Sequence, residues 1–162
     1  MNKKALLVAA TIVLLLTGCA MTEYKPVEIT SVVNVPDQEQ KELFKRTRQW
    51  FSQYFVSGES VIDYEDIESG TIIGNGMANI GTDTFGLITY KIKYNIRIDT
   101  KDNKFRALTK ILEHINTDSQ RTYSAAYITE ERIADAEKHV NEIVKSIEEY
   151  VTDQKVDSNS DW

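Results

Sequence analysis

Residues 88–99 of the 162-residue chain read ITYKIKYNIRID, and this stretch decides the fold. Polar or charged side chains alternate here with apolar ones, and the apolar set is Ile88, Tyr90, Ile92, Tyr94, Ile96 and Ile98. Because successive side chains of a β-strand point to opposite faces, the alternation predicts a strand with one buried face and one face in water. Such strands are typical of an antiparallel sheet that is covered on one side only.

The sequence on the N-terminal side of this central strand predicts three more strands. Apolar and polar residues alternate over 27–35, and two further strands are predicted over 61–66 and 71–80, the second interrupted by Gly74 and Gly76. The turn-forming residues at 67–70 connect the last two of these strands. Residues 81–86 are mostly polar, so we predict a loop before the central strand.

Beyond the central strand, Asp102 and Asn103 predict a hairpin turn. The run 105–115 fits the apolar spacing of a helix and also fits a strand that returns along the central one. The hairpin before it favours the strand, and a strand is our prediction. Residues 116–124 are polar, which predicts a loop.

A first helix is predicted after Pro36. Asp37 is a good residue to cap a helix N-terminus, and Gly58 is expected to end the helix. The predicted apolar face of this helix consists of Leu43, Phe44, Thr47, Trp50, Phe51, Tyr54 and Phe55. Its basic residues are expected largely off that face, and they are Lys41, Lys45, Arg46 and Arg48.

A second helix is predicted to begin at Thr129, with Glu130 and Glu131 near the positive end of the helix dipole. Its apolar stripe consists of Ile133, Ala136, Val140, Ile143, Val144, Ile147, Tyr150 and Val151. The element order β-α-β-β-β-β-α predicts an α+β fold, with both helices packed on one face of an antiparallel sheet. With 41% hydrophobic residues, the chain is expected to form a single domain over 27–151 and a disordered acidic tail over 152–162.

Several features occur together between the first predicted helix and the predicted hairpin. An aromatic helix surrounds Trp50, an acidic stretch follows residues 61–62, the run GTIIGNG occupies 70–76, and the hairpin spans 102–105. In these features the chain resembles a bacterial family of unknown function with a TBP-like fold, over about residues 37–115. The resemblance implies a sheet with two helices in an exported, often lipidated protein, and it implies no catalytic residues. DNA binding does not follow from the fold label, because one fold supports many functions.

The first 19 residues carry a separate signal. Lys3 and Lys4 precede the apolar run 5–16, which is too short to span a bilayer and has the length of a signal-peptide core. The run leads into Leu16-Thr17-Gly18-Cys19, which resembles the lipobox of bacterial lipoproteins: Leu, a small residue, Gly or Ala, then Cys. The alternative is an ordinary signal peptide with a chance cysteine.

The lipobox resemblance predicts how the N-terminus is processed. Residues 1–18 are then a lipoprotein signal peptide, the thiol of Cys19 carries the lipid, and 19–26 form a lipidated tether to the membrane. In many Gram-negative bacteria, Asp after the lipidated cysteine retains the protein in the inner membrane, and Ala20 stands there instead. We therefore expect an outer-membrane lipoprotein whose domain faces the periplasm.

A basic stripe is expected on the solvent face of the central strand, formed by Lys91, Lys93 and Arg97. Arg106 and Lys110 join it if residues from 105 onward form the neighbouring strand. Such a stripe fits an anionic lipid or an acidic protein partner. The alternative is a solvated face that discourages edge pairing. The chain as a whole has a formal net charge of −6, which argues against a nucleic-acid partner.

Other groups of residues offer weaker signals. The acidic residues Asp63, Glu65, Asp66 and Glu68 lack the spacing of a calcium loop, and a solvated strand end is expected there. The glycines of the 70–86 region lack the context of a phosphate-binding loop, so strand bulges or close packing are expected. His114 and His139 lack metal-ligand spacing and are expected at the surface or at the rim of the core. We predict no catalytic residues, no metal site and no cofactor.

The sequence therefore favours a non-catalytic binding or envelope-assembly module. The alternative is a small hydrolase or other enzyme that acts on cell-envelope material. An enzyme needs a deep pocket with converging polar groups and shifted pKa values, whereas a binding module needs a broad exposed face.

Overall fold

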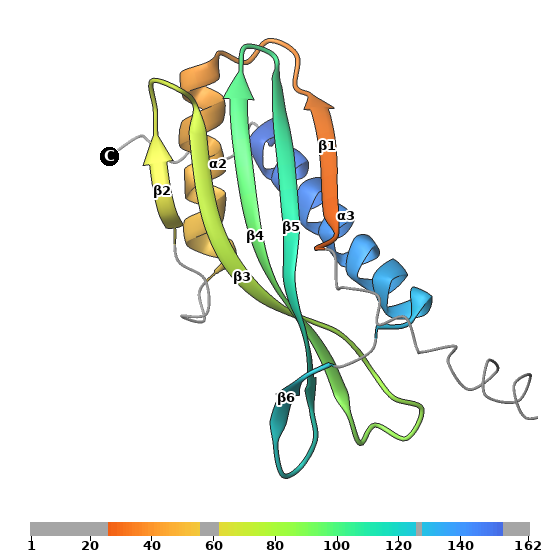
Figure 1. The fold of residues 1–162 in the computed structure, drawn as a ribbon. Helices are drawn as coiled ribbons and strands as arrows, with labels where there is room; N and C mark the ends of the chain where they lie inside the picture. The colour runs from red at the N-terminus through yellow and green to blue at the C-terminus, as the bar shows by residue number, and fades with distance from the viewer. Residues whose placement is uncertain (1–25, 56–61, 126–127, 154–162) are drawn as a thin grey trace, which may run out of the picture.

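The computed structural model describes residues 26–55, 62–125 and 128–153. Six strands and two helices occupy them, in the order β1 (Glu28–Asn34), α2 (Gln40–Tyr54), β2 (Ile62–Asp66), β3 (Thr71–Thr82), β4 (Thr89–Lys101), β5 (Lys104–Thr117), β6 (Thr122–Ser124) and α3 (Glu130–Thr152). All pairings are antiparallel, in the order β1-β5-β4-β3-β2, and β6 pairs with the far end of β5. Both helices lie on one face of the sheet (Figure 1), which confirms the predicted α+β architecture.

The strand predicted over 105–115 is confirmed, but the polar segment after it is not simply a loop. β5 continues to Thr117, turns at Asp118, and pairs with the short strand β6. β3 likewise extends to Thr82, past its predicted end, with a register shift between Asn79 and Gly81. Backbone hydrogen bonds stabilise these extensions. Because backbone pairing does not depend on an apolar side-chain pattern, the polar sequence did not predict them.

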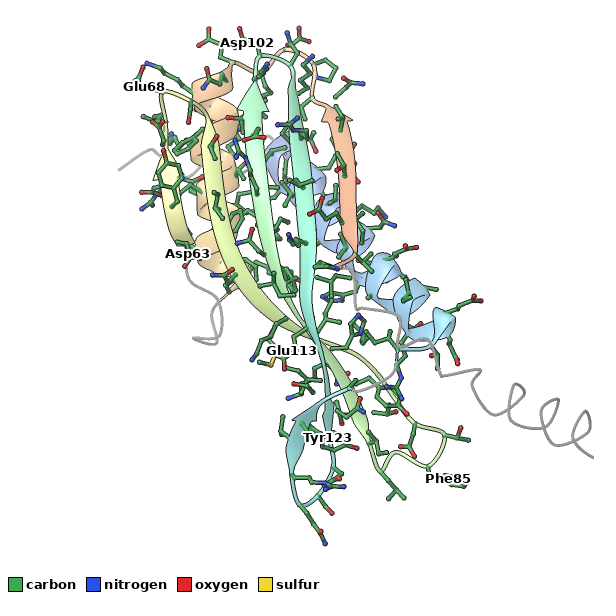
Figure 2. The ribbon with its side chains drawn as sticks, in the orientation of Figure 1. Asp63, Glu68, Phe85, Asp102, Glu113 and Tyr123 are labelled. Carbon is green, nitrogen blue, oxygen red and sulfur yellow. The ribbon has the colours of Figure 1, made fainter. Side chains whose placement is uncertain are left out.

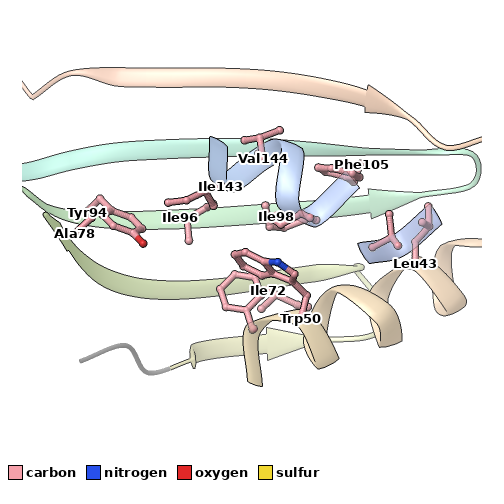
Figure 3. Close-up of a cluster of buried hydrophobic side chains, with 14 of the residues drawn as sticks. Leu43, Trp50, Ile72, Ala78, Tyr94, Ile96, Ile98, Phe105, Ile143 and Val144 are labelled. Atoms are coloured by element: carbon pink, nitrogen blue, oxygen red, sulfur yellow. The ribbon is translucent and has the colours of Figure 1, made fainter. Parts of the chain in front are cut away.

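The alternation of the central strand survives intact in β4. Ile92, Tyr94, Ile96 and Ile98 are buried on the face that carries the helices, and Figure 3 shows three of them in the core. Trp50 of α2 packs into the same core with 3% of its surface exposed. Its indole Nε1 donates a hydrogen bond of 3.0 Å to Ser146 Oγ of α3, so the polar edge of this large ring is satisfied inside the helix layer.

The start of α2 differs from the prediction. Asp37 is not the N-cap residue: it has φ +62° in the turn before the helix, and Glu39 stands at the N-cap without a side-chain hydrogen bond. The free backbone N–H of Gln40 donates instead to Asp102 Oδ1 at 2.8 Å. The β4–β5 hairpin thus caps the helix from another part of the chain, and no local sequence signal reports this contact.

Arg46 was expected off the apolar face of α2, and this expectation is wrong, because only 5% of the residue is exposed. Its Nε donates to Glu42 Oε1 at 2.8 Å, and its Nη1 donates to the carbonyl oxygens of Val151 at 3.2 Å and Asp153 at 3.3 Å. The guanidinium therefore satisfies the last carbonyls of α3, a helix with no basic residue in its own last turn. Thr152 belongs to α3, so the helix extends into the segment predicted as tail.

Close packing explains the glycine of β3 that faces Tyr94. A Cβ atom at Gly76 would lie 2.4 Å from Tyr94 Cζ, so the ring of Tyr94 fits only because residue 76 has no side chain. The close-packing interpretation of the glycines is confirmed at this position. Burial raises the pKa of the Tyr94 hydroxyl well above its ordinary value, with a smaller contribution from Tyr54.

The predicted signal peptide, lipobox and lipidated Cys19 lie outside the described residues, as do Gly58 and the tail from residue 154. Within the described ranges, neither helix combines the length and apolar character needed to cross a bilayer.

Candidate functional site

The face of the sheet opposite the helices, called here the outer face, is open to solvent and carries most of the exposed strand side chains (Figure 2). Along β4 and β5 its basic side chains are Lys91, Lys93, Arg97, Lys101, Lys104, Arg106 and Lys110. On the other side of the molecule, α3 has the opposite balance, with seven acidic and three basic residues. Charge is therefore distributed unevenly, with a basic outer face on one side of the sheet and the acidic helix α3 on the other, while α2 has more basic than acidic residues.

The three residues of the predicted stripe share the outer face of β4, as the alternation requires. Two of them have acidic partners on that face: Lys93 Nζ lies 3.0 Å from Glu113 Oε2, and Arg97 Nε lies 2.7 Å from Asp99 Oδ1. Mutual repulsion along the stripe is therefore relieved by local ion pairs. These exposed pairs contribute little to stability, and their main effect is to hold the side chains in place.

Asp99 is the anchor of the basic cluster. It accepts hydrogen bonds from Arg97, from Arg106 Nη2 at 2.6 Å, and from Thr71 Oγ1 at 2.9 Å. Partial burial acts to raise the pKa of this carboxyl, but the three hydrogen bonds outweigh it and lower the pKa. Asp99 is therefore held ionised, which makes it a weak base and a good organiser of guanidinium groups.

A small cavity of about 220 Å³ lies beside Asp99, at the end of the β4–β5 hairpin. Lys101, Lys104 and Arg106 line it together with Val32, which is 61% exposed on the edge strand β1. Lys101 and Lys104 were not among the residues predicted for the stripe. Their pairing across the Asp102-Asn103 turn was a signal that could have found them, because a two-residue hairpin places the flanking residues opposite each other.

The acidic residues of β2 separate rather than converge. A register shift between Ile62 and Tyr64 breaks the alternation, so Asp63 meets Asn75 on the outer face while Glu65 pairs with Arg48 of α2 at 2.6 Å. Simple alternation would place Asp63 and Glu65 on one face, and they lie on different faces because the bulge shifts one residue past its partner. Asn75 continues the contact across the face by accepting from Asn95.

The two histidines lie apart from the basic cavity. His114 sits in β5 with 4% of its surface exposed, so its expected surface or rim position is wrong, and burial followed by the charge of Arg132 lowers its pKa. Burial also lowers the pKa of His139 in α3, against the opposing effect of Glu142. Among the described residues no cluster of three or more His, Cys, Asp or Glu side chains has the geometry to hold a metal ion.

A single family model matches a continuous stretch of the chain that contains α2 and most of the sheet. Residues 30–114, which include α2, the strands β2 to β4 and most of β1 and β5, match the domain of unknown function DUF4468 with TBP-like fold. The chain belongs to this family. The match confirms the resemblance drawn from the sequence and attaches no chemical activity to the family.

Solved structures support the same fold assignment. A TBP-like protein from Parabacteroides distasonis is 14% identical with a TM-score of 0.60, and the alignment covers 82% of this chain and 98% of that one. A DUF4468 family protein from Bacteroides ovatus is 13% identical with a TM-score of 0.57, covering 83% and 92%. At these identities the likeness concerns the fold alone. The comparison with curated protein sequences gives no match.

Proposed function

We propose that this DUF4468 protein is a lipid-anchored module of the outer membrane that binds an acidic protein partner through the outer face of its sheet. The observation that carries the proposal is the polarised charge: seven basic side chains line β4 and β5, while α3 behind the sheet is acidic. Complementary potentials of this kind orient partners and speed their association. The lipid anchor rests on the sequence Leu16-Thr17-Gly18-Cys19.

The geometry of the outer face favours binding over catalysis. The cavity beside Asp99 is small, at about 220 Å³, and its lining residues include no histidine. Its one carboxyl, Asp99, has a lowered pKa, whereas a general acid or base works best with a pKa near the ambient pH. The alternative of an envelope hydrolase finds no matching feature in this cavity.

The mixture of side chains favours a protein over a lipid headgroup as the partner. Val32 and Tyr64 are 61% and 51% exposed, and they lie on the two edge strands of the sheet, β1 and β2, on either side of its basic centre. Exposed aromatic side chains and arginines on one surface are enriched at protein interfaces. A face that bound only phosphate groups would need the cations without these apolar neighbours.

The binding proposal is tested by photo-crosslinking in cells. A photoreactive residue replaces Val32 on the outer face or, as the matched control, Lys145 on the exposed face of α3. We expect an acidic protein to be captured from position 32 and not from position 145, with a yield that falls as salt is added to isolated membranes. Equal capture from both positions, or adducts with lipid alone from position 32, would contradict the proposal.

The anchor has its own test. The variant Cys19→Ser removes the thiol that would carry the lipid, so labelled fatty acid should enter the wild-type protein and not the variant. Fractionation of the cell envelope then locates the wild-type protein. Equal labelling of both chains would rule out lipidation at Cys19 and leave the binding face to be judged by the crosslinking experiment.

A further inference from the structure

Two of the most exposed apolar side chains of the described residues lie together at one end of the molecule. Phe85 and Leu87 occupy the β3–β4 loop and are 82% and 70% exposed. This loop and the β5–β6 hairpin form a distal arm, residues 79–90 and 113–124, that projects beyond helix α2 (Figure 2). Exposed apolar side chains that lie together mark an interaction site more often than apolar residues scattered singly over a surface.

The tip loop is built to hold these side chains outward. Asp83 Oδ1 accepts from the backbone N–H groups of Leu87 at 2.6 Å and Ile88 at 2.8 Å, and the Gly86 N–H donates to the Asp83 carbonyl at 3.0 Å. Gly86 adopts φ +70°, which glycine accepts without strain. Three backbone N–H groups of the loop are thus bonded to Asp83, which fixes the conformation of the loop between Phe85 and Ile88.

The base of the arm is braced against the rest of the domain. The Arg132 guanidinium of α3 stacks over the Tyr90 ring, with its carbon 3.5 Å from the ring centroid. The same guanidinium donates through Nη1 to Asn116 Oδ1 at 3.1 Å. Both halves of the arm are therefore tied to α3, and the tip keeps a defined direction relative to the body.

We propose that Phe85 and Leu87 dock into the lipid surface to which the protein is anchored. The strands of the sheet then point away from the membrane, and the outer face does not contact the lipid. The inference deepens the proposed function and rests on its lipid anchor at Cys19. Two apolar side chains bind a bilayer only weakly on their own, but a tether keeps them at high local concentration beside it.

The position where β1 begins and the number of residues between Cys19 and β1 fit this arrangement. β1 begins at the end of the sheet nearest the arm, where Glu28 pairs with Lys110 and the Ile111 N–H donates to the Val27 carbonyl at 2.9 Å. Six residue steps along β5 separate Ile111 from Thr117, which pairs with Thr89 where the tip loop begins, and they cover about 20 Å at the usual rise of a strand. The eight residues from Cys19 to Pro26 reach at most about 28 Å when extended. The acylated residue can therefore lie in the same plane as the tip.

The experiment measures the depth of the tip in the bilayer, using the full lipidated chain in phosphatidylcholine vesicles. Because the lipid occupies the sulfur of Cys19, the variant Thr84→Cys has a single free thiol, next to Phe85, for a fluorescent label. The matched control is Glu68→Cys in the β2–β3 turn at the opposite end of the molecule (Figure 2). Nitroxide groups on the lipid acyl chains should quench the label at position 84 at least about twofold more than the label at position 68.

A second pair of variants asks which side chains make the contact. Adding Phe85→Ser and Leu87→Ser to the Thr84→Cys chain should remove the extra quenching. Adding Ile67→Ser, which changes a 44% exposed apolar residue in the β2–β3 turn at the opposite end of the molecule, should leave the quenching unchanged. Quenching that survives the loss of Phe85 and Leu87 overturns the assignment to these residues.

The remaining outcomes separate this inference from the proposed function. Equal quenching at positions 84 and 68 on vesicle-bound, acylated protein overturns the docking of the tip and leaves the anchor intact. A label at position 84 that is already shielded without vesicles indicates contact with a second copy of the chain, and it also overturns the inference. A chain without acyl groups by mass spectrometry overturns the proposed anchor, and the inference that rests on it.

Discussion

The two faces of β4 are made by alternate residues of one strand, yet they are held in different ways. On the inner face Ile92, Tyr94, Ile96 and Ile98 are almost completely buried beneath the two helices. On the outer face Lys93 and Arg97 remain half exposed and are held by acidic neighbours. Burial of apolar surface stabilises the first arrangement, whereas exposed ion pairs organise the second with little effect on stability.

Because the two faces are stabilised in different ways, substitutions can alter the stability of the fold and the proposed binding surface independently. Substitutions on the inner face should affect unfolding, and substitutions on the outer face should affect partner capture. Each of the following predictions tests that separation, beginning with the largest expected change in the free energy of unfolding.

The largest effect is expected on the inner face at Trp50. Trp50→Ala removes a side chain with 3% exposure and leaves Ser146 without its indole partner, so the free energy of unfolding should fall by about 3–5 kcal/mol. Urea denaturation measures this loss. The control Val32→Ala, on the exposed edge strand, should change it by less than about 0.5 kcal/mol. Similar losses in the two variants would mean that the faces do not differ as described.

A smaller effect is expected where the strand makes room for a ring. Gly76→Ala places a Cβ atom 2.4 Å from Tyr94 Cζ, so overpacking should lower the free energy of unfolding by about 1–3 kcal/mol. In a Tyr94→Leu background the ring is absent, and the same substitution should be much better tolerated. Equal losses in both backgrounds would show that the contact with Tyr94 is not the cause.

The contribution of Asp99, on the outer face, to the free energy of unfolding should depend on pH. The pKa of Asp99 is lowered in the folded protein, so its contribution is present above the unfolded pKa of about 4 and is lost as the pH falls through the folded pKa. Asp99→Asn should lower the free energy of unfolding by about 1 kcal/mol at pH 7, and the difference from wild type should shrink as the pH drops below about 4. A constant difference from pH 7 to pH 3, measured by urea denaturation, would indicate a packing effect instead.

The parts of the structure that the sequence predicted are those that depend on side-chain alternation. The period of β4 predicted a half-buried antiparallel sheet, and the apolar stripes of α2 and α3 predicted which face they cover. The cap of α2 by Asp102 and the burial of Arg46 against α3 were missed, because both join residues far apart in the chain. β6 was missed because backbone pairing alone defines it.

The candidate site was predicted only in part, for a related reason. Alternation placed Lys91, Lys93 and Arg97 on one face, but it did not reveal that Asp99 and Glu113 would pair with two of them. The cavity beside Val32 depends on the order of strands in the sheet. It forms because β1, the first strand of the chain, pairs with β5, which lies far from it in the sequence. Strand order is a tertiary property that no short pattern specifies.

The most direct test of the account combines stability and binding in one variant of the outer face. Replacing Lys91, Lys93 and Arg97 together with Gln should change the free energy of unfolding by less than about 1 kcal/mol, because exposed charges contribute little. The same variant should reduce crosslinking of the partner from position 32 by at least about tenfold, since the attraction to an acidic surface is weakened. The control Lys138→Gln with Lys145→Gln, on α3, should leave the yield unchanged. A stable triple variant that captures the partner as well as wild type would contradict the account.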